Sequence, residues 1–297
     1  MRAEPVAELV ELFDRVGADV AMYALDLATG EGFGANADRR VVTASVFKVP
    51  IMLVYAEEVA RGRLDPAERV VVTEEARVPG PTGLSVFTDP VELSLRDLAL
   101  QMMTVSDNTS TDVLLARIGG VARVQEAIET IGLRETIIPC GARGIVESLM
   151  SELGPALEAA GGDLAAVPAE VVDGLTALDP ARTCSSTALE VVTLLAGIWA
   201  DHAAAPDACA EVRRVMGLQV WPHRIASGFP DGYEWAGKTG TLPAVRNEAG
   251  VVTLPDGGDA AVAIFTRARD HRENRPDIDR AMGVAARRAT EWLISGR

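Results

Sequence analysis

Histidine and cysteine are scarce in this chain of 297 residues, which has three of each. Cys140, Cys184 and Cys209 show neither CxxC spacing nor a neighbouring histidine, so neither a disulfide framework nor a zinc site is expected. Three histidines also leave few parts for a metal centre or a histidine-based catalytic triad. We therefore expect no metal ion and no cofactor.

Positive charge and long apolar runs are lacking as well. The chain has 28 basic and 43 acidic residues, a formal net charge of −15, and the excess is spread along the sequence. Nucleic acids and anionic membranes need a basic face, so neither is expected as a partner. No run of about 18 apolar residues is present, which predicts no membrane span.

The N-terminus carries Glu4, Glu8 and Glu11 where a signal peptide needs an unbroken apolar run. The sequence thus indicates a cytoplasmic protein, or a secreted or periplasmic one from which a leader was removed. We expect a monomer whose partner is a small molecule.

The hydrophobic period changes along the chain. Residues 5–16 have apolar positions at helical spacing, and a Gly-bearing hairpin follows them. From about residue 45 to 200 the pattern is mostly helical, although glycines and prolines interrupt it repeatedly over 140–182. One of these helices is expected over 95–104, with Ser94 and Asp97 placed as its capping pair. After Gly228 the period becomes two, which predicts three antiparallel strands before a closing helix over 277–294.

This order predicts a mixed α/β (α+β) fold, with an antiparallel sheet, flanked by terminal helices, and an inserted all-helical lobe. Residues 1–43 and 222–297 would form the sheet lobe, and residues 44–221 the helical lobe. The active site of this single unit is expected between the two lobes.

Ser45 and Lys48 begin a predicted helix as Ser-Val-Phe-Lys. A separation of three places the hydroxyl and the ammonium on one helix face, within hydrogen-bonding reach. The helix N-terminus favours a developing oxyanion, and a lysine whose pKa is lowered by burial can serve as a base. Alone, this tetrapeptide is a weak signal and favours a helix cap followed by a solvated lysine.

Two further motifs follow in order. Ser106-Asp107-Asn108 precedes a predicted helix, and Lys238-Thr239-Gly240 lies on a predicted strand near the C-terminus. Singly, they would indicate a helix cap and an edge strand. The three motifs together, each on a suitable element, indicate a serine-based acyl-transfer site.

In these motifs, and over most of its length, the chain resembles the class A β-lactamases and penicillin-binding proteins, whose signature is SxxK, SDN and KTG. The flanks TASVFKVPI, MMTVSDNTSTDVLL and VRNEAGVV are similar too. The resemblance implies a β-lactamase-like fold and a Ser45 acyl-enzyme.

The resemblance also implies a role for each matching residue. Lys48 would take the proton of Ser45, Ser106 would relay a proton to the leaving nitrogen, and Lys238 would keep that region positive. Substrate binding would fall to Asn108, Thr239, Gly240, Thr241 and Arg246. Backbone N–H groups of Ser45 and Thr241 would form the oxyanion hole.

One part of the family pattern is missing. Class A β-lactamases carry an ExxLN motif after SDN, whose glutamate activates the deacylating water, and no ExxLN occurs here. Glu170 stands at about the right distance before Lys238, but a solvated surface glutamate is the plain alternative. Asp112 replaces the asparagine that usually holds this loop. We expect a rebuilt loop over roughly 140–182.

Three functions remain open at this point. The first is a serine β-lactamase-like hydrolase that acts on a β-lactam or a related amide or ester, with slow turnover. The second is a penicillin-binding-type D-Ala-D-Ala peptidase or transpeptidase. The third is a non-hydrolytic β-lactam binder, against which the intact Ser–Lys–Ser–Lys set argues.

Overall fold

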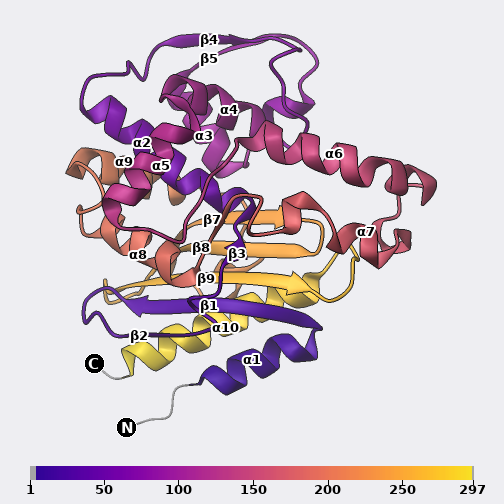
Figure 1. Ribbon diagram of the computed structural model, residues 1–297. Coiled ribbons are helices and arrows are strands. Elements are labelled where there is room, and N and C mark those ends of the chain that lie inside the picture. Colours follow the sequence, from indigo (N-terminus) through magenta and orange to yellow (C-terminus); the bar gives the residue numbers. More distant parts are fainter. Residues whose placement is uncertain (1–4, 296–297) are drawn as a thin grey trace.

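Both ends of the sequence contribute strands to one antiparallel sheet in the computed structural model, which describes residues 5–295. The strand order is β2-β1-β9-β8-β7 (Figure 1). The strands are β1 (Ala18–Asp26), β2 (Gly32–Ala35), β7 (Glu234–Leu242), β8 (Val245–Thr253) and β9 (Asp259–Ala268). The mixed α/β fold and the antiparallel sheet are confirmed.

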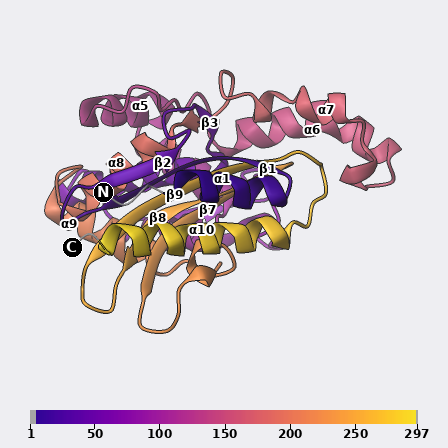
Figure 2. The same cartoon turned by 90° about the horizontal axis from the view of Figure 1, so that it is seen from below.

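Two layers of helices cover the sheet. Helices α1 (Val6–Arg15) and α10 (Pro276–Ile294) lie along one face (Figure 2). On that face Val262 and Ile264 belong to the core shared with these helices. Ala263 and Phe265, which alternate with them, pack into the core of the other helices. The period-two pattern of β9 thus separates two hydrophobic cores.

The remaining helices lie between the two sheet-forming ends. They are α2 (Lys48–Ala60), α3 (Leu95–Thr104), α4 (Asn108–Arg117), α5 (Gly120–Ile131), α6 (Ala142–Ala159), α7 (Ala169–Asp173), α8 (Ala188–Trp199) and α9 (Pro206–Met216). Short pairs join β3 (Val41–Val42) to β6 (Ser185–Ser186) and β4 (Arg69–Val72) to β5 (Val91–Ser94). The 3-10 turns are η1 (Ala44–Phe47), η2 (Gly83–Val86), η3 (Leu164–Ala166), η4 (Thr176–Leu178) and η5 (Ile225–Gly228).

Helix α2 is the central helix of this part. Every residue from Lys48 to Glu58 is buried, so α2 is enclosed rather than amphipathic. Nearby, the expected capping pair of α3 is present: Ser94 Oγ accepts the N–H of Asp97 at 3.3 Å. Among the helices of residues 5–295, none has the length and apolarity needed to cross a membrane.

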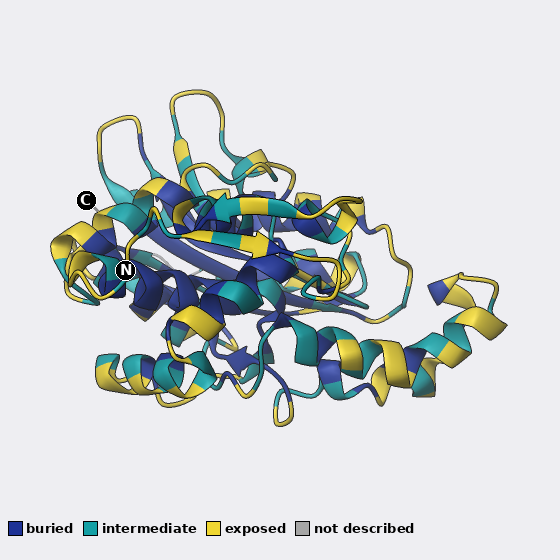
Figure 3. Cartoon of the chain, turned by 90° about the horizontal axis from the view of Figure 1, so that it is seen from above, coloured by how far each residue is buried: buried dark blue, intermediate teal, exposed yellow. Residues whose placement is uncertain are grey.

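Helix α6 is the main departure from the sequence expectation. Glycine and proline suggested an interrupted segment here, yet α6 runs for 18 residues with Pro155 inside it. Pro155 is exposed, so the helical carbonyl that its missing N–H leaves free can bond to water. Helices α6 and α7 project to one side of the protein as an arm with many exposed positions (Figure 3).

Candidate active site

Ser45 lies in η1, the 3-10 turn that runs directly into α2. Ser45 is partly exposed, whereas Ala44 and Val46 beside it are buried. Ala44 has a φ of 46°, a left-handed conformation that costs a residue with a Cβ about 1 kcal/mol or more. Ala44 belongs to the same hydrophobic cluster as Leu164 and Val245, and this packing holds the strained turn.

Strand β7 approaches this turn closely at Gly240. A Cβ on Gly240 would come within 2.6 Å of the Thr43 carbonyl oxygen and 3.1 Å of the Ser45 nitrogen, so only glycine permits the contact. β7 is an edge strand, and Thr239 N–H bonds outward to Gln219 Oε1 at 2.8 Å. Alternation along the strand directs the N–H of Thr241 to the same outer edge.

Lys48 is completely buried at the start of α2. Its Nζ donates to the Ser106 carbonyl oxygen at 2.7 Å, to Ser106 Oγ at 3.2 Å and to Asn108 Oδ1 at 2.9 Å. Burial lowers the pKa of Lys48 to about 7, against the opposing attraction of Asp107 and Asp112. Near neutral pH a large share of Lys48 is therefore the free amine, which can accept a proton.

Ser106 brings the two lysines together. Lys238 Nζ donates to Ser106 Oγ at 2.9 Å and to the Thr239 carbonyl oxygen at 2.9 Å. Burial, followed by the charge of Lys48, holds the pKa of Lys238 well below its usual range. Ser106 itself has a φ of 64°. Its hydroxyl is thus fixed between two buried amines and can pass a proton from one group to another.

The expected direct contact between Ser45 and Lys48 is not formed within residues 5–295, where the side-chain hydrogen bonds of Lys48 go to Ser106 and Asn108. Ser45 lies in a 3-10 turn rather than in the α-helix that the sequence predicts. Asn108 also donates Nδ2 to the Pro79 carbonyl oxygen at 3.1 Å. One N–H of that amide stays available for a ligand.

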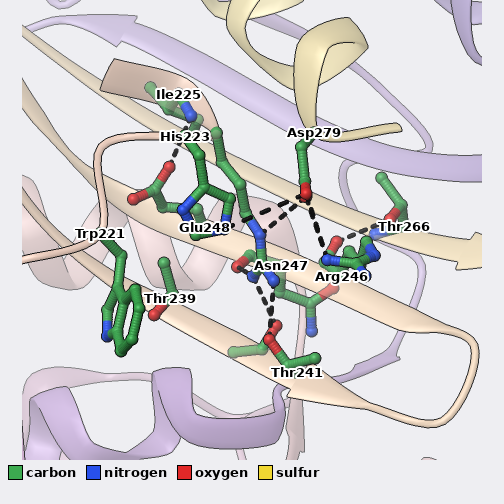
Figure 4. A network of polar contacts seen from close by, with 12 residues as sticks. Trp221, His223, Ile225, Thr239, Thr241, Arg246, Asn247, Glu248, Thr266 and Asp279 are labelled. Carbon is green, nitrogen blue, oxygen red and sulfur yellow. Dashed lines mark hydrogen bonds and ion pairs between the residues drawn. The ribbon is translucent and has the colours of Figure 1, made fainter. Parts of the chain in front are cut away.

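Arg246 lies on the other face of the sheet from Lys238. It is the register partner of Thr241, and positions 238 and 241 of a strand point to opposite faces. The Arg246 guanidinium contacts Asp279 Oδ2 on α10 at 3.2 Å (Figure 4). It also donates to the Glu273 carbonyl oxygen. Arg246, which the resemblance places among the substrate-binding residues, therefore does not lie beside Lys238, and this expectation is corrected.

Arg224 is the residue that the sequence reasoning missed. Its side chain is 3% exposed, and it donates to Thr241 Oγ1 at 2.7 Å and to the Gly240 carbonyl oxygen at 2.9 Å. It also pairs with Asp279 at 3.0 Å. Arg224 thus places a buried positive charge directly under the end of β7. Only its isolation between apolar residues, in WPHRIAS, could have indicated this.

Asp112, which replaces the asparagine of the family pattern, contacts the start of the segment that lacks the ExxLN motif. The two carboxylate oxygens of Asp112 accept the N–H groups of Ala142 at 2.7 Å and Arg143 at 2.8 Å, at the start of α6. A Cβ on Gly141 would lie 2.4 Å from Asp112 Oδ1. An aspartate suits this place because a helix start offers only donors and a positive dipole end.

Glu170 is not brought to the nucleophile. It is an exposed residue of α7, and within residues 5–295 no hydrogen bond joins it to Ser45, Lys48 or Ser106. Four other carboxylates of the segment have partners elsewhere: Glu147 with Arg143, Glu152 with Thr176, Asp173 with Arg267, and Asp179 with Arg182. Helix α6 starts where the family pattern would place its loop.

The lowered pKa of Lys48 predicts the pH dependence of acylation. A general base works only when it is unprotonated, so the acylation rate should fall about tenfold per pH unit below pH 7 and level off above it. Stopped-flow measurement of the acylation rate with a penicillin between pH 5 and 9 gives this pH profile. In Lys48→Ala this fall of the acylation rate below pH 7 should disappear. If the variant still shows it, the titrating base is another group.

Comparisons with known proteins bear on the family and the fold of the chain. The model of the β-lactamase enzyme family matches residues 4–293. A β-lactamase regulatory protein, BlaB, of Streptomyces cacaoi is 31% identical over 96% of each chain. The crystal structure of a β-lactamase from Sphaerobacter thermophilus is 25% identical, covers 100% of this chain and 99% of its own, and superposes with a TM-score of 0.80. The structure of PBP-A, 20% identical over 97% of this chain and 96% of its own, superposes with a TM-score of 0.76 and shares the fold.

Proposed function

The chain belongs to the β-lactamase enzyme family, and on that premise we propose that it opens β-lactams through an acyl-enzyme on Ser45 and hydrolyses that intermediate slowly. Family and fold together make it a serine β-lactamase-like hydrolase. The observation that carries the residue assignment is the convergence of Lys48 and Lys238 on Ser106 Oγ.

Acylation uses the groups described above. Neutral Lys48 takes the Ser45 proton, Ser45 Oγ bonds to the lactam carbonyl carbon, and the C–N bond of the ring breaks. Ser106 passes a proton from the lysines to the leaving nitrogen. The N–H groups of Ser45 and Thr241 stabilise the oxyanion, an effect worth roughly 3–4 kcal/mol in comparable sites.

Substrate binding falls to the β7 edge and Asn108. The free N–H of Asn108 suits the amide oxygen of a β-lactam side chain. Thr239 and Thr241 would offer their hydroxyls to the substrate carboxylate at the outer edge of β7. Lys238, whose side chain leaves the strand on the opposite face, would add positive charge through its contact with Ser106. Arg224, rather than Arg246, supplies the supporting guanidinium because it bonds to Thr241 directly.

Arg224→Ala should therefore slow acylation more than Arg246→Ala. Loss of a charge-assisted hydrogen bond to the Thr241 hydroxyl should lower the second-order acylation rate at least ~10-fold, while Arg246→Ala should change it less than about threefold. Reporter-substrate kinetics measure both, and circular dichroism checks that each variant is folded. Equal losses of acylation rate in the two folded variants would show that Arg224 does not support substrate binding more than Arg246 does.

Intact mass spectrometry tests the proposed function. The protein is mixed with a penicillin, a cephalosporin and a peptide ending in D-Ala-D-Ala, and sampled over time. We expect one β-lactam adduct per chain that persists for many minutes, and an unchanged peptide. Rapid release of D-Ala, with weak β-lactam adducts, would favour the peptidase instead.

A β-lactam receptor is the second candidate. It is favoured because, within residues 5–295, no carboxylate hydrogen-bonds to or forms an ion pair with the side chains of Ser45, Lys48 or Ser106, and by the regulatory protein among the relatives. An acyl-enzyme that persists for hours, rather than minutes, would select it over the slow hydrolase.

We also propose that one chain acts alone. Ser45 and Ser106 come from residues 44–221 and Lys238 from the sheet-forming residues 222–297, so a single copy supplies all members of the site. Size-exclusion chromatography coupled to light scattering should give a mass near 31.4 kDa.

A further inference from the structure

Two of the three cysteines lie against each other beside the site. Cys184 is fully buried, and its Sγ donates to the Cys140 carbonyl oxygen at 3.4 Å. The two thiols are close enough for each to shift the pKa of the other. Both are free thiols. Cys209 is buried on α9, where its Sγ contacts the Ala204 carbonyl oxygen at 3.6 Å, so it provides a natural control.

The backbone fixes this pair from both sides. Ile137 and Ser185 exchange two hydrogen bonds, at 2.9 and 3.0 Å, which hold the two segments antiparallel. Thr43 then donates its N–H and its hydroxyl to the Cys184 carbonyl oxygen, each at 3.0 Å. The thiols are thus held in contact by hydrogen-bonded chain rather than by mobile loops.

The two thiols differ in exposure and acidity. Cys140 is partly exposed and Cys184 is buried. The Cys184 side chain lowers the pKa of Cys140, and the Cys140 side chain, with burial, raises the pKa of Cys184. Cys140 also lies over the first turn of α6, where a Cβ on Gly144 would be 3.2 Å from its Sγ. A helix start favours the thiolate.

We propose that Cys140 and Cys184 form a redox-active pair which a hydroperoxide converts into an intramolecular disulfide. The Cys140 thiolate attacks the peroxide O–O bond and becomes a sulfenic acid, with release of water when the peroxide is H₂O₂. The Cys184 thiol then attacks the sulfenic sulfur and a second water leaves. Two thiols are oxidised and one peroxide is reduced.

The disulfide would close the base of the segment that carries α6 and α7. One end would lie just before Gly141, next to the Asp112 contact that starts α6. The other end would lie just before β6, at Cys184, whose carbonyl oxygen accepts hydrogen bonds from Thr43, two residues before Ser45. The cross-link would lower the conformational entropy of the unfolded chain and so raise the melting temperature by about 5 °C or more. The proposal does not depend on β-lactam chemistry.

Mass spectrometry with thiol counting tests the proposal. The reduced chain is treated with a small excess of H₂O₂, denatured and alkylated with N-ethylmaleimide. We expect one label instead of three, a loss of about two mass units for the two hydrogens, and a peptide pair joining Cys140 to Cys184. Cys209→Ala should keep the cross-link, and Cys140→Ser should abolish it.

The alternatives have distinct readouts. Three labels after treatment, a sulfinic acid on Cys140 beside a free Cys184, a cross-link to Cys209, or a dimer on a non-reducing gel would each overturn the proposal. So would an oxidised protein that melts at or below the reduced one, because the folded backbone would then resist the bond. Circular dichroism of reduced Cys140→Ser checks that the variant is folded.

Discussion

Benzylpenicillin should add its full mass to the wild-type protein and none to Ser45→Ala. The alanine variant lacks the Ser45 hydroxyl, the group that we place in η1 for attack on the lactam, so the loss should be complete. The buried set around Lys48, Ser106 and Lys238 does not involve the Ser45 hydroxyl, and the variant should therefore stay folded. Intact mass spectrometry gives the answer directly.

Ser151→Ala is the matched control, since Ser151 is an exposed serine on α6. It should keep the adduct in full. An adduct that persists in Ser45→Ala would move the nucleophile to another residue, and peptide mapping of that adduct would find it.

A chromogenic cephalosporin such as nitrocefin should give a burst of about one equivalent, followed by turnover at least ~100-fold slower. Acylation has Lys48 and Ser106 as proton carriers, but water attack on the ester needs a second base. Within residues 5–295 the carboxylates of the α6–α7 arm contact other partners or solvent. Stopped-flow absorbance separates the two phases.

Glu170→Gln and Glu147→Gln should leave both phases unchanged, because both glutamates are exposed. Fast, burst-free turnover that Glu170→Gln converts into a burst would contradict this reading, since it would mean that α7 reaches the ester in solution. Fast turnover that neither substitution affects would require a base that is still unidentified.

Local signals in the sequence predicted much of the sheet and the motif elements. The alternation in β7, β8 and β9 and the capping pair at Ser94 depend on neighbours a few residues away, and the structure confirms them. The length of α6 could not be predicted, because Pro155 is tolerated only through its exposed position. Helix α9 and the β4–β5 pair were also not predicted.

Prediction of the site was limited in the same way, because local sequence signals do not report tertiary contacts. The meeting of Lys48 and Lys238 at Ser106 followed from motifs whose spacing is known for the family. The place of Arg246 required the strand register, in which one step reverses the face, and Arg224 is tied to Thr241 only by tertiary contacts. The pairing of Cys140 with Cys184 was equally hidden, because nothing in their spacing indicates it.

The pairing of β1 with β9 sets an order of events during protein synthesis. Residues 18–26 leave the ribosome early, but their partner, residues 259–268, is made almost last. Until then β1 has only β2 beside it, and a two-stranded hairpin is marginal in water. Helices α1 and α8 can already cover the faces of β1, but the strand edge that β9 will occupy must wait, exposed or sheltered by a chaperone. Nascent chains stalled before residue 259 should consequently be the most aggregation-prone form of this protein.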